Sequence, residues 1–144
     1  MAYASVLEHD LDWLEYRLKS MFTWSPQRAR MGVDNYRNFL RCLQIVEDPD
    51  TLAPSQAIDD VWHVHIINTP DYTAMCDRYF GKYIHHYIGH AKPGADMKAN
   101  FQRFCALYRD TFHKPLEEWR WSLRDFFTTW LGKETGRRTV LIKR

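Results

Sequence analysis

Residues 54–66 read PSQAIDDVWHVHI, and this stretch predicts a helix that begins at its proline–serine pair. At about 100° per residue, its apolar side chains share one side of the helix with His65. Asp59 and His63 lie about 40° apart on another face, whereas His63 and His65 are about 160° apart. The predicted helix therefore has one apolar face, suited to packing in a core, and a second face that carries Asp59 and His63.

Apolar residues spaced three or four apart predict further helices on both sides of this stretch. Ser5 and Glu8 are placed as a capping box for the first of them. Residues 82–94 contain glycine, proline and histidine without a helical period, so we expect a loop there. The fold predicted is all-α, a compact bundle of about five to six helices with a histidine-rich loop after the fourth. The helices are expected over residues 6–22, 26–47, 54–66, 69–80, 95–112 and 116–131.

The composition is that of an ordinary globular protein, with 45% apolar and 26% charged residues in a chain of 144. We expect one helical domain over residues 1–131 and a basic tail over 132–144, interpreted as a solvated extension rather than a nucleic-acid surface. The apolar run at 139–142 fits a strand, a docked tail or a partner contact. The sequence shows neither a secretion signal nor a membrane-spanning run, which predicts a cytoplasmic protein.

Three cysteines stand far apart in helical contexts, and this spacing predicts no disulfide. Cys42 and Cys105 fit helix stripes and are expected in the core. Cys76 is one turn after Tyr72, where it is a candidate thiolate ligand or a nucleophile activated by histidine, although a small buried side chain is favoured. A partner surface and core packing both fit the aromatic stripe of Trp119, Phe126, Phe127 and Trp130, and core packing is the default.

The residues that suggest chemistry are Asp59 and His63 on the predicted helix, followed about twenty positions later by His85 and His86. One carboxylate with two or three imidazoles suits a divalent metal, either zinc or iron. We expect Asp59 and His63 as the first pair and a third ligand from the loop. The spacing is not that of the HExxH motif. The alternative is a helix i, i+4 pair together with a core histidine at position 65.

Outside this region, His9 and His113 have no constellation of acidic residues and histidines around them that suggests a site, so they are assigned no role. The candidate metal residues are therefore Asp59, His63, His65, His85 and His86.

A long motif runs through this region: Pro54-Ser55-x-x-Ile58-Asp59-x-Val61-Trp62-His63-x-His65-Ile66-x-x-Thr69-x-x-Tyr72-x-x-x-Cys76, then Phe80-Gly81-x-x-Ile84-His85-His86. It resembles the glycine-rich domain-containing protein-like family. Further matches extend the resemblance over roughly residues 6–121: Tyr16-Arg17-Leu18 with Trp24, Tyr36-Arg37-x-Phe39-Leu40, and Tyr108-x-x-x-Phe112-x-x-Pro115 with Trp119.

The resemblance implies a helical domain with a shared histidine cluster, and it implies no particular activity. This chain has only six glycines and no glycine-rich segment, so the roles suggested for that appendage, RNA binding among them, are not carried over. Relatives usually turn through a proline after the second loop histidine. Here residues 87–90 intervene, which leaves His90 as a further candidate ligand.

Three hypotheses about function follow. The first is a divalent-metal site that supports hydrolytic or oxidative chemistry on an unidentified small molecule. The second is a non-enzymatic adaptor for a protein partner, in which the histidines form a buried hydrogen-bond network. The third is metal-free catalysis with a histidine as general base beside Cys76 or Tyr72. Whether the protein is an enzyme is left open.

Overall fold

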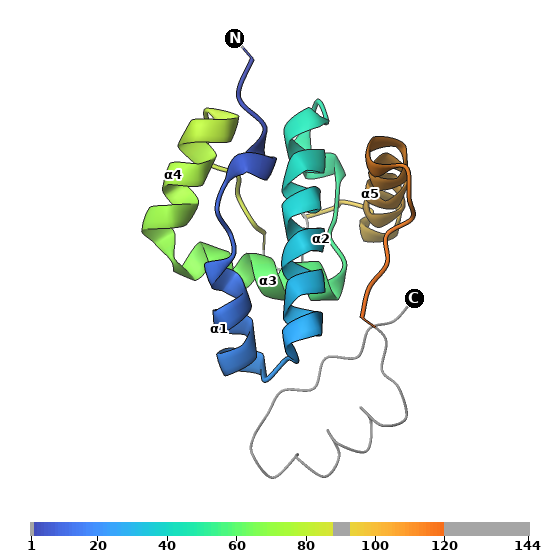
Figure 1. Ribbon diagram of the computed structural model, residues 1–144. Helices are drawn as coiled ribbons and strands as arrows, with labels where there is room; N and C mark the ends of the chain where they lie inside the picture. Colours follow the sequence, from blue (N-terminus) through green and yellow to red (C-terminus); the bar gives the residue numbers. More distant parts are fainter. Residues whose placement is uncertain (1, 88–92, 120–144) are drawn as a thin grey trace.

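The central element of the fold is α2 (Pro26–Ile45), which packs against α1 (Trp13–Phe22), α3 (Gln56–Ile67) and α5 (Met97–Phe112) in the computed structural model. The structure describes residues 2–87 and 93–119. Figure 1 shows α4 (Thr69–Phe80) and α5 on opposite sides of the α1–α2 pair, with α3 crossing behind it. These residues contain five α-helices, two short 3-10 helices and no strand, which confirms the all-α prediction.

Local sequence signals explain where α2 begins and ends. The Ser25 hydroxyl oxygen accepts the backbone N–H of Arg28 at 3.2 Å, and Pro26 occupies the first turn, where its missing N–H is not needed. The helix ends shortly before Pro49, which opens the short helix η2 (Pro49–Thr51). Its buried face carries large side chains such as Tyr36, and these join the main hydrophobic core.

The N-terminal region differs from the prediction. A continuous helix over 6–22 is wrong, because the chain forms a 3-10 turn, η1 (Val6–Glu8), and restarts as α1 at Trp13. Ser5 caps that turn through the N–H of Leu7, and the expected capping box with Glu8 is absent from this described region. The Asp10 carboxylate accepts the N–H of Asp12 at 2.9 Å, which stabilises a turn in place of a helix.

The next two helices follow the predicted pattern closely. Ser55 caps α3 through the N–H of Ile58, and α4 ends at Gly81, whose φ of 68° is the left-handed conformation typical of a helix C-terminus. Asn68 separates the two helices. Residues 82–87 and 93–94 form the described part of the predicted loop and contain no helix.

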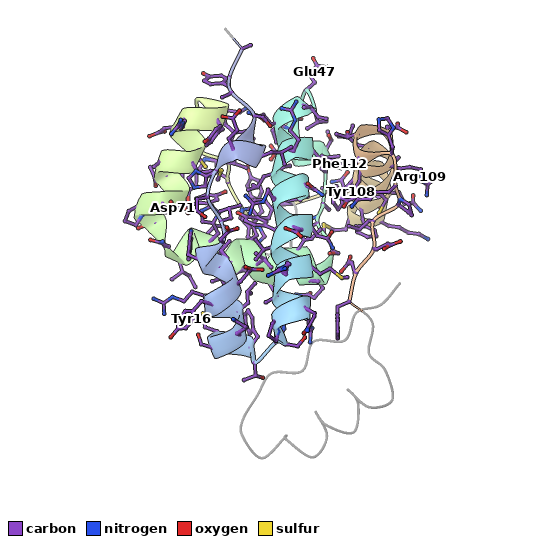
Figure 2. All side chains as sticks on the ribbon, in the orientation of Figure 1. Tyr16, Glu47, Asp71, Tyr108, Arg109 and Phe112 are labelled. Carbon is purple, nitrogen blue, oxygen red and sulfur yellow. The ribbon has the colours of Figure 1, made fainter. Side chains whose placement is uncertain are left out.

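The C-terminal part of the described chain is α5, capped by Asp96 through the N–H of Ala99. Its residues Tyr108 and Phe112 lie on the side facing α2, and Arg109 lies on the outer side (Figure 2). The helix predicted to start at Leu116 is wrong at its start, because residues 115–119 are not helical; Asn35 donates a hydrogen bond to the carbonyl of Glu117. The rest of that helix, the run at 139–142 and the basic tail lie outside the described residues.

All three cysteines are free, as predicted. Cys42 and Cys76 are buried, and Cys105 is half-buried. Burial raises the pKa of the Cys42 thiol to about 12 and raises that of Cys76, so both favour the neutral thiol. Within residues 2–87 and 93–119, none of the helices has the length and apolar character needed to span a membrane.

Candidate functional site

A first group of metal-type side chains, the Asp59 group, consists of Asp59 and His63 on α3 and His86 from the segment after α4. His63 Nδ1 lies 3.1 Å from Asp59 Oδ2, and His86 Nε2 lies 2.8 Å from Asp59 Oδ1. One ligand atom of each residue lies within 4.8 Å of the others. A single carboxylate is thus flanked by two imidazoles that come from separate segments.

The position of His86 is fixed by aromatic residues of α3 and α4. Its ring stacks on Trp62 with a centroid separation of 4.3 Å and an interplanar angle of 7°. The Trp62 indole N–H donates to the Tyr72 hydroxyl at 3.0 Å, and this hydroxyl donates to the Ile84 carbonyl at 2.6 Å. The Ile84 N–H points at Cys76 Sγ, 3.5 Å away. Two helices therefore hold the backbone just before His86.

The Asp59 group is buried on one side and open on the other. The side chains of Asp59 and His86 are 1% and 7% exposed, whereas that of His63 is 55% exposed. A carboxylate in such surroundings needs cationic or N–H partners, because its charge loses hydration on burial. His63 is therefore the member of the group that meets solvent.

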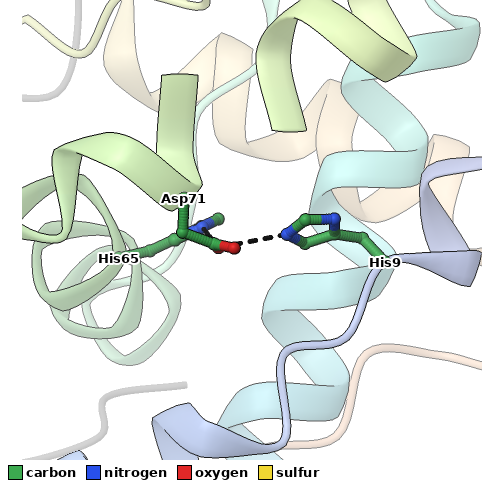
Figure 3. Close-up of side chains that lie close together, drawn as sticks. All are labelled: His9, His65 and Asp71. Atoms are coloured by element: carbon green, nitrogen blue, oxygen red, sulfur yellow. Dashed lines mark hydrogen bonds and ion pairs between the residues drawn. The ribbon is translucent and has the colours of Figure 1, made fainter. Parts of the chain in front are cut away.

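A second group, the Asp71 group, joins His9 after η1, His65 on α3 and Asp71 in the first turn of α4 (Figure 3). The Nε2 atoms of His65 and His9 lie 2.8 Å and 3.0 Å from the same atom, Asp71 Oδ2. Tyr36 from α2 adds a hydroxyl 2.7 Å from His65 Nδ1. Four segments of the chain therefore meet at one polar cluster beside the core.

Burial sets the charge state of His65. Its ring is fully buried, and loss of hydration lowers its pKa to about 4, against the opposing hydrogen bond and charge of Asp71. Burial acts to raise the pKa of Asp71, but the hydrogen bonds and charges of His9 and His65 outweigh it and hold that pKa below its ordinary value. At neutral pH His65 is neutral and Asp71 is ionised. Because the carboxylate only accepts, His65 donates from Nε2, and its Nδ1 accepts from the Tyr36 hydroxyl.

The residues predicted as a single site are divided by the structure. Asp59, His63 and His86 come together, which is the arrangement of one helix pair and one loop ligand that the sequence suggested. His65 faces the opposite side of α3 and belongs to the Asp71 group. His85 is exposed, with its ring 5.0 Å from that of Tyr83, and is in neither group. His90 lies outside the described residues.

His9, to which the sequence assigned no role, contacts Asp71, which is 62 positions away in the sequence. No local pattern could reveal that contact. Asp71 itself follows His65 by six positions across the α3–α4 junction, and the short linker between two predicted helices was an available signal for this pair. Cys76 is buried beside Tyr72 and belongs to neither group among the described residues, which fits a core thiol.

Residues 14–105 match the protein family described as UCP032817-like. The matched span includes every residue of both groups except His9. No curated protein and no solved structure matches the chain.

Proposed function

This chain belongs to the UCP032817-like family, and from the geometry of the Asp59 group we propose that it is a divalent-metal-binding protein. The observation that carries the proposal is the convergence of Asp59, His63 and His86. Two imidazoles and one carboxylate form the ligand set of zinc sites with an open position and of non-haem iron(II) sites. Zinc and iron(II) are therefore the ions expected.

The distances support coordination by these atoms. Ligands bound at about 2.1 Å to one ion lie about 3.0 Å apart at right angles and about 3.4 Å apart in a tetrahedron. The Asp59 carboxylate oxygens lie 3.1 Å from His63 Nδ1 and 2.8 Å from His86 Nε2. An ion bound between these atoms would take the place of the protons that the groups now share.

The exposure of the group bears on what a bound ion could do. Three protein ligands leave coordination positions free, and the side at His63 is open to solvent. A bound ion would supply Lewis acidity, which lowers the pKa of a bound water for hydrolysis or supports an oxidation. The stacked Trp62 ring covers one face of His86 and limits water on that side.

A metal-free network is the second candidate, and one contact favours it. His63 Nδ1 also donates to the backbone carbonyl of Asp59 at 2.7 Å, so this nitrogen carries a proton in the arrangement seen. Metal binding through Nδ1 requires the proton to move to Nε2 and that hydrogen bond to break. The two functions therefore differ in the protonated nitrogen of His63, and ion binding decides between them.

The test is metal analysis of purified protein that is stripped with chelator, reloaded with Zn²⁺ and dialysed. We expect His63→Ala to lose one ion per chain relative to the parent, because the variant removes a ligand. Its side chain is 55% exposed, so the fold should be retained. His86→Ala should give the same loss. The control is His85→Ala, an exposed neighbour outside the group.

Equal ion content in the parent, His63→Ala and His86→Ala would overturn the proposal and favour the hydrogen-bond network. Repeating the reload with Co²⁺ would indicate the geometry, since tetrahedral cobalt absorbs visible light much more strongly than octahedral cobalt. A tetrahedral spectrum favours zinc as the natural ion, and an octahedral one favours iron(II).

A further inference from the structure

The Asp71 group has its own set of metal ligands, separate from that of the Asp59 group. We propose that His9, His65 and Asp71 bind a second divalent cation, which fastens the N-terminal segment to α3 and α4. The close-up in Figure 3 shows the His9 ring directed at the Asp71 carboxylate, and His65 Nε2 lies 2.8 Å from the same carboxylate oxygen. The proposal shares no ligand with the Asp59 group, so each can fail without the other.

Ring nitrogens of two histidines converge on one carboxylate oxygen. Both Nε2 atoms approach the same oxygen, with His65 at 2.8 Å and His9 at 3.0 Å from Asp71 Oδ2. These separations match the spacing of about 3.0 Å between neighbouring ligands on an ion bound at about 2.1 Å. Nitrogen and carboxylate ligands of this kind suit zinc, iron(II) or manganese more than calcium, which prefers oxygen alone.

The group is also held in place by contacts outside it. The Tyr36 hydroxyl lies 2.7 Å from His65 Nδ1, and Arg37 donates to the backbone carbonyl of His9 at 2.8 Å. A hydroxyl can donate or accept, so it remains a partner of His65 Nδ1 when the proton moves there and frees Nε2 for a metal. Such an outer hydrogen bond to a ligating histidine is a general feature of protein metal sites.

Access and location indicate a structural role for the ion. The side chains of His65, His9 and Asp71 are 0%, 15% and 30% exposed, so among these three the carboxylate is the most open to solvent. The surrounding rings of Trp13, Tyr36, Tyr72 and Tyr79 leave little space for a substrate beside His65 and His9. An ion there would join the segment before α1 to α3 and α4.

The two ions would occupy different sides of α3. His63 and His65 are two positions apart, and their side chains lie about 160° apart around the helix axis. The 55% exposure of His63 and the complete burial of His65 agree with this separation. One ion cannot bind both residues, and the fully loaded chain should contain two.

Counting ions tests the proposal directly. After chelation, Zn²⁺ reload and dialysis, the parent should hold two ions per chain, and His9→Gln and Asp71→Asn should each hold one. His63→Ala should also hold one, and the double variant His9→Gln/His63→Ala none. The control is Asp77→Asn, which removes an exposed carboxylate from the same helix as Asp71 and should keep two.

The structural role has a separate readout. Zn²⁺ should slow hydrogen exchange of the backbone around residues 5–12 at least tenfold in the parent and in His63→Ala, but not in His9→Gln. The proposal is overturned if His9→Gln and Asp71→Asn bind as many ions as the parent, which would leave the group a proton-bonded network. One ion per chain that is lost in His63→Ala and kept in His9→Gln would refute only this second site. The reverse pattern would refute only the Asp59 group.

Discussion

The metal-free protein should lose stability as the pH falls from about 6.5 to about 4, because His65 is buried as a neutral ring. The unfolded chain takes up a proton on this imidazole near its ordinary pKa of 6.5, whereas burial lowers the pKa in the folded protein to about 4. Between these values the unfolded state binds one more proton than the folded state. The stability that depends on a neutral His65 is therefore fully present above pH 6.5 and is lost on acidification.

The size of the effect follows from the two pKa values. Within the window the free energy of unfolding should fall by up to about 1.4 kcal/mol per pH unit, which is the value for one proton. From pH 7 to pH 5 this amounts to a loss of about 2 kcal/mol, and by pH 4 to about 3 kcal/mol. Asp71 adds to the loss only below its ordinary pKa of 3.8, because its folded pKa is lowered.

The assay is urea denaturation at half-unit pH steps from 7 to 4 with chelator present, on the parent and on His65→Gln. The glutamine variant does not titrate, so its free energy of unfolding should vary less steeply with pH by up to about 1.4 kcal/mol per unit. His85→Gln, at an exposed position, serves as the control and should follow the parent. Parallel pH profiles for the parent and His65→Gln would refute the assignment of a neutral, buried His65.

Two further substitutions test the packing around the sites. Tyr72→Phe removes the hydroxyl that accepts from Trp62 and donates to the Ile84 carbonyl. Urea denaturation should show that the free energy of unfolding falls by about 1–3 kcal/mol, and a fall below about 0.5 kcal/mol would contradict this. Gly32→Ala should lower the midpoint of thermal unfolding, because the added Cβ would lie 2.8 Å from the buried Trp24 ring. This clash should cost about 1–3 kcal/mol, more than the gain of about 1 kcal/mol from the higher helix propensity of alanine. A raised midpoint would show that the ring can move.

The sequence predicted the helices well wherever the signals were local. Ser25 with Pro26, Ser55 and Gly81 each act at the end of their own helix, so a few neighbouring residues suffice to locate it. The prediction was wrong where a local turn competed with an apolar period. The hydrogen bond from the Asp12 N–H to Asp10 interrupts a stripe that the spacing of leucines alone could not distinguish from a continuous helix.

In the candidate sites too, contacts within one helix could be predicted from the sequence and contacts between distant segments could not. The angle between Asp59 and His63 follows from helix geometry, and the structure places both beside His86 as expected. The partners of His65 could not be derived in the same way. Asp71 approaches because the chain turns at Asn68, and His9 approaches only because the N-terminal helix is interrupted. Contacts of this kind depend on the packing of whole elements.

The break before α1 and the Asp71 group have a common physical basis. His9 has extended backbone, with φ of −70° and ψ of 133°, and its carbonyl accepts from Arg37 on α2 instead of from a helical N–H. In a continuous helix over 6–22 that carbonyl would be used within the helix, and Arg37 would lack this partner. The turn at Asp10 thus frees the backbone of His9 for α2 and its ring for Asp71. The turn that breaks the predicted N-terminal helix therefore also brings His9 into the Asp71 group.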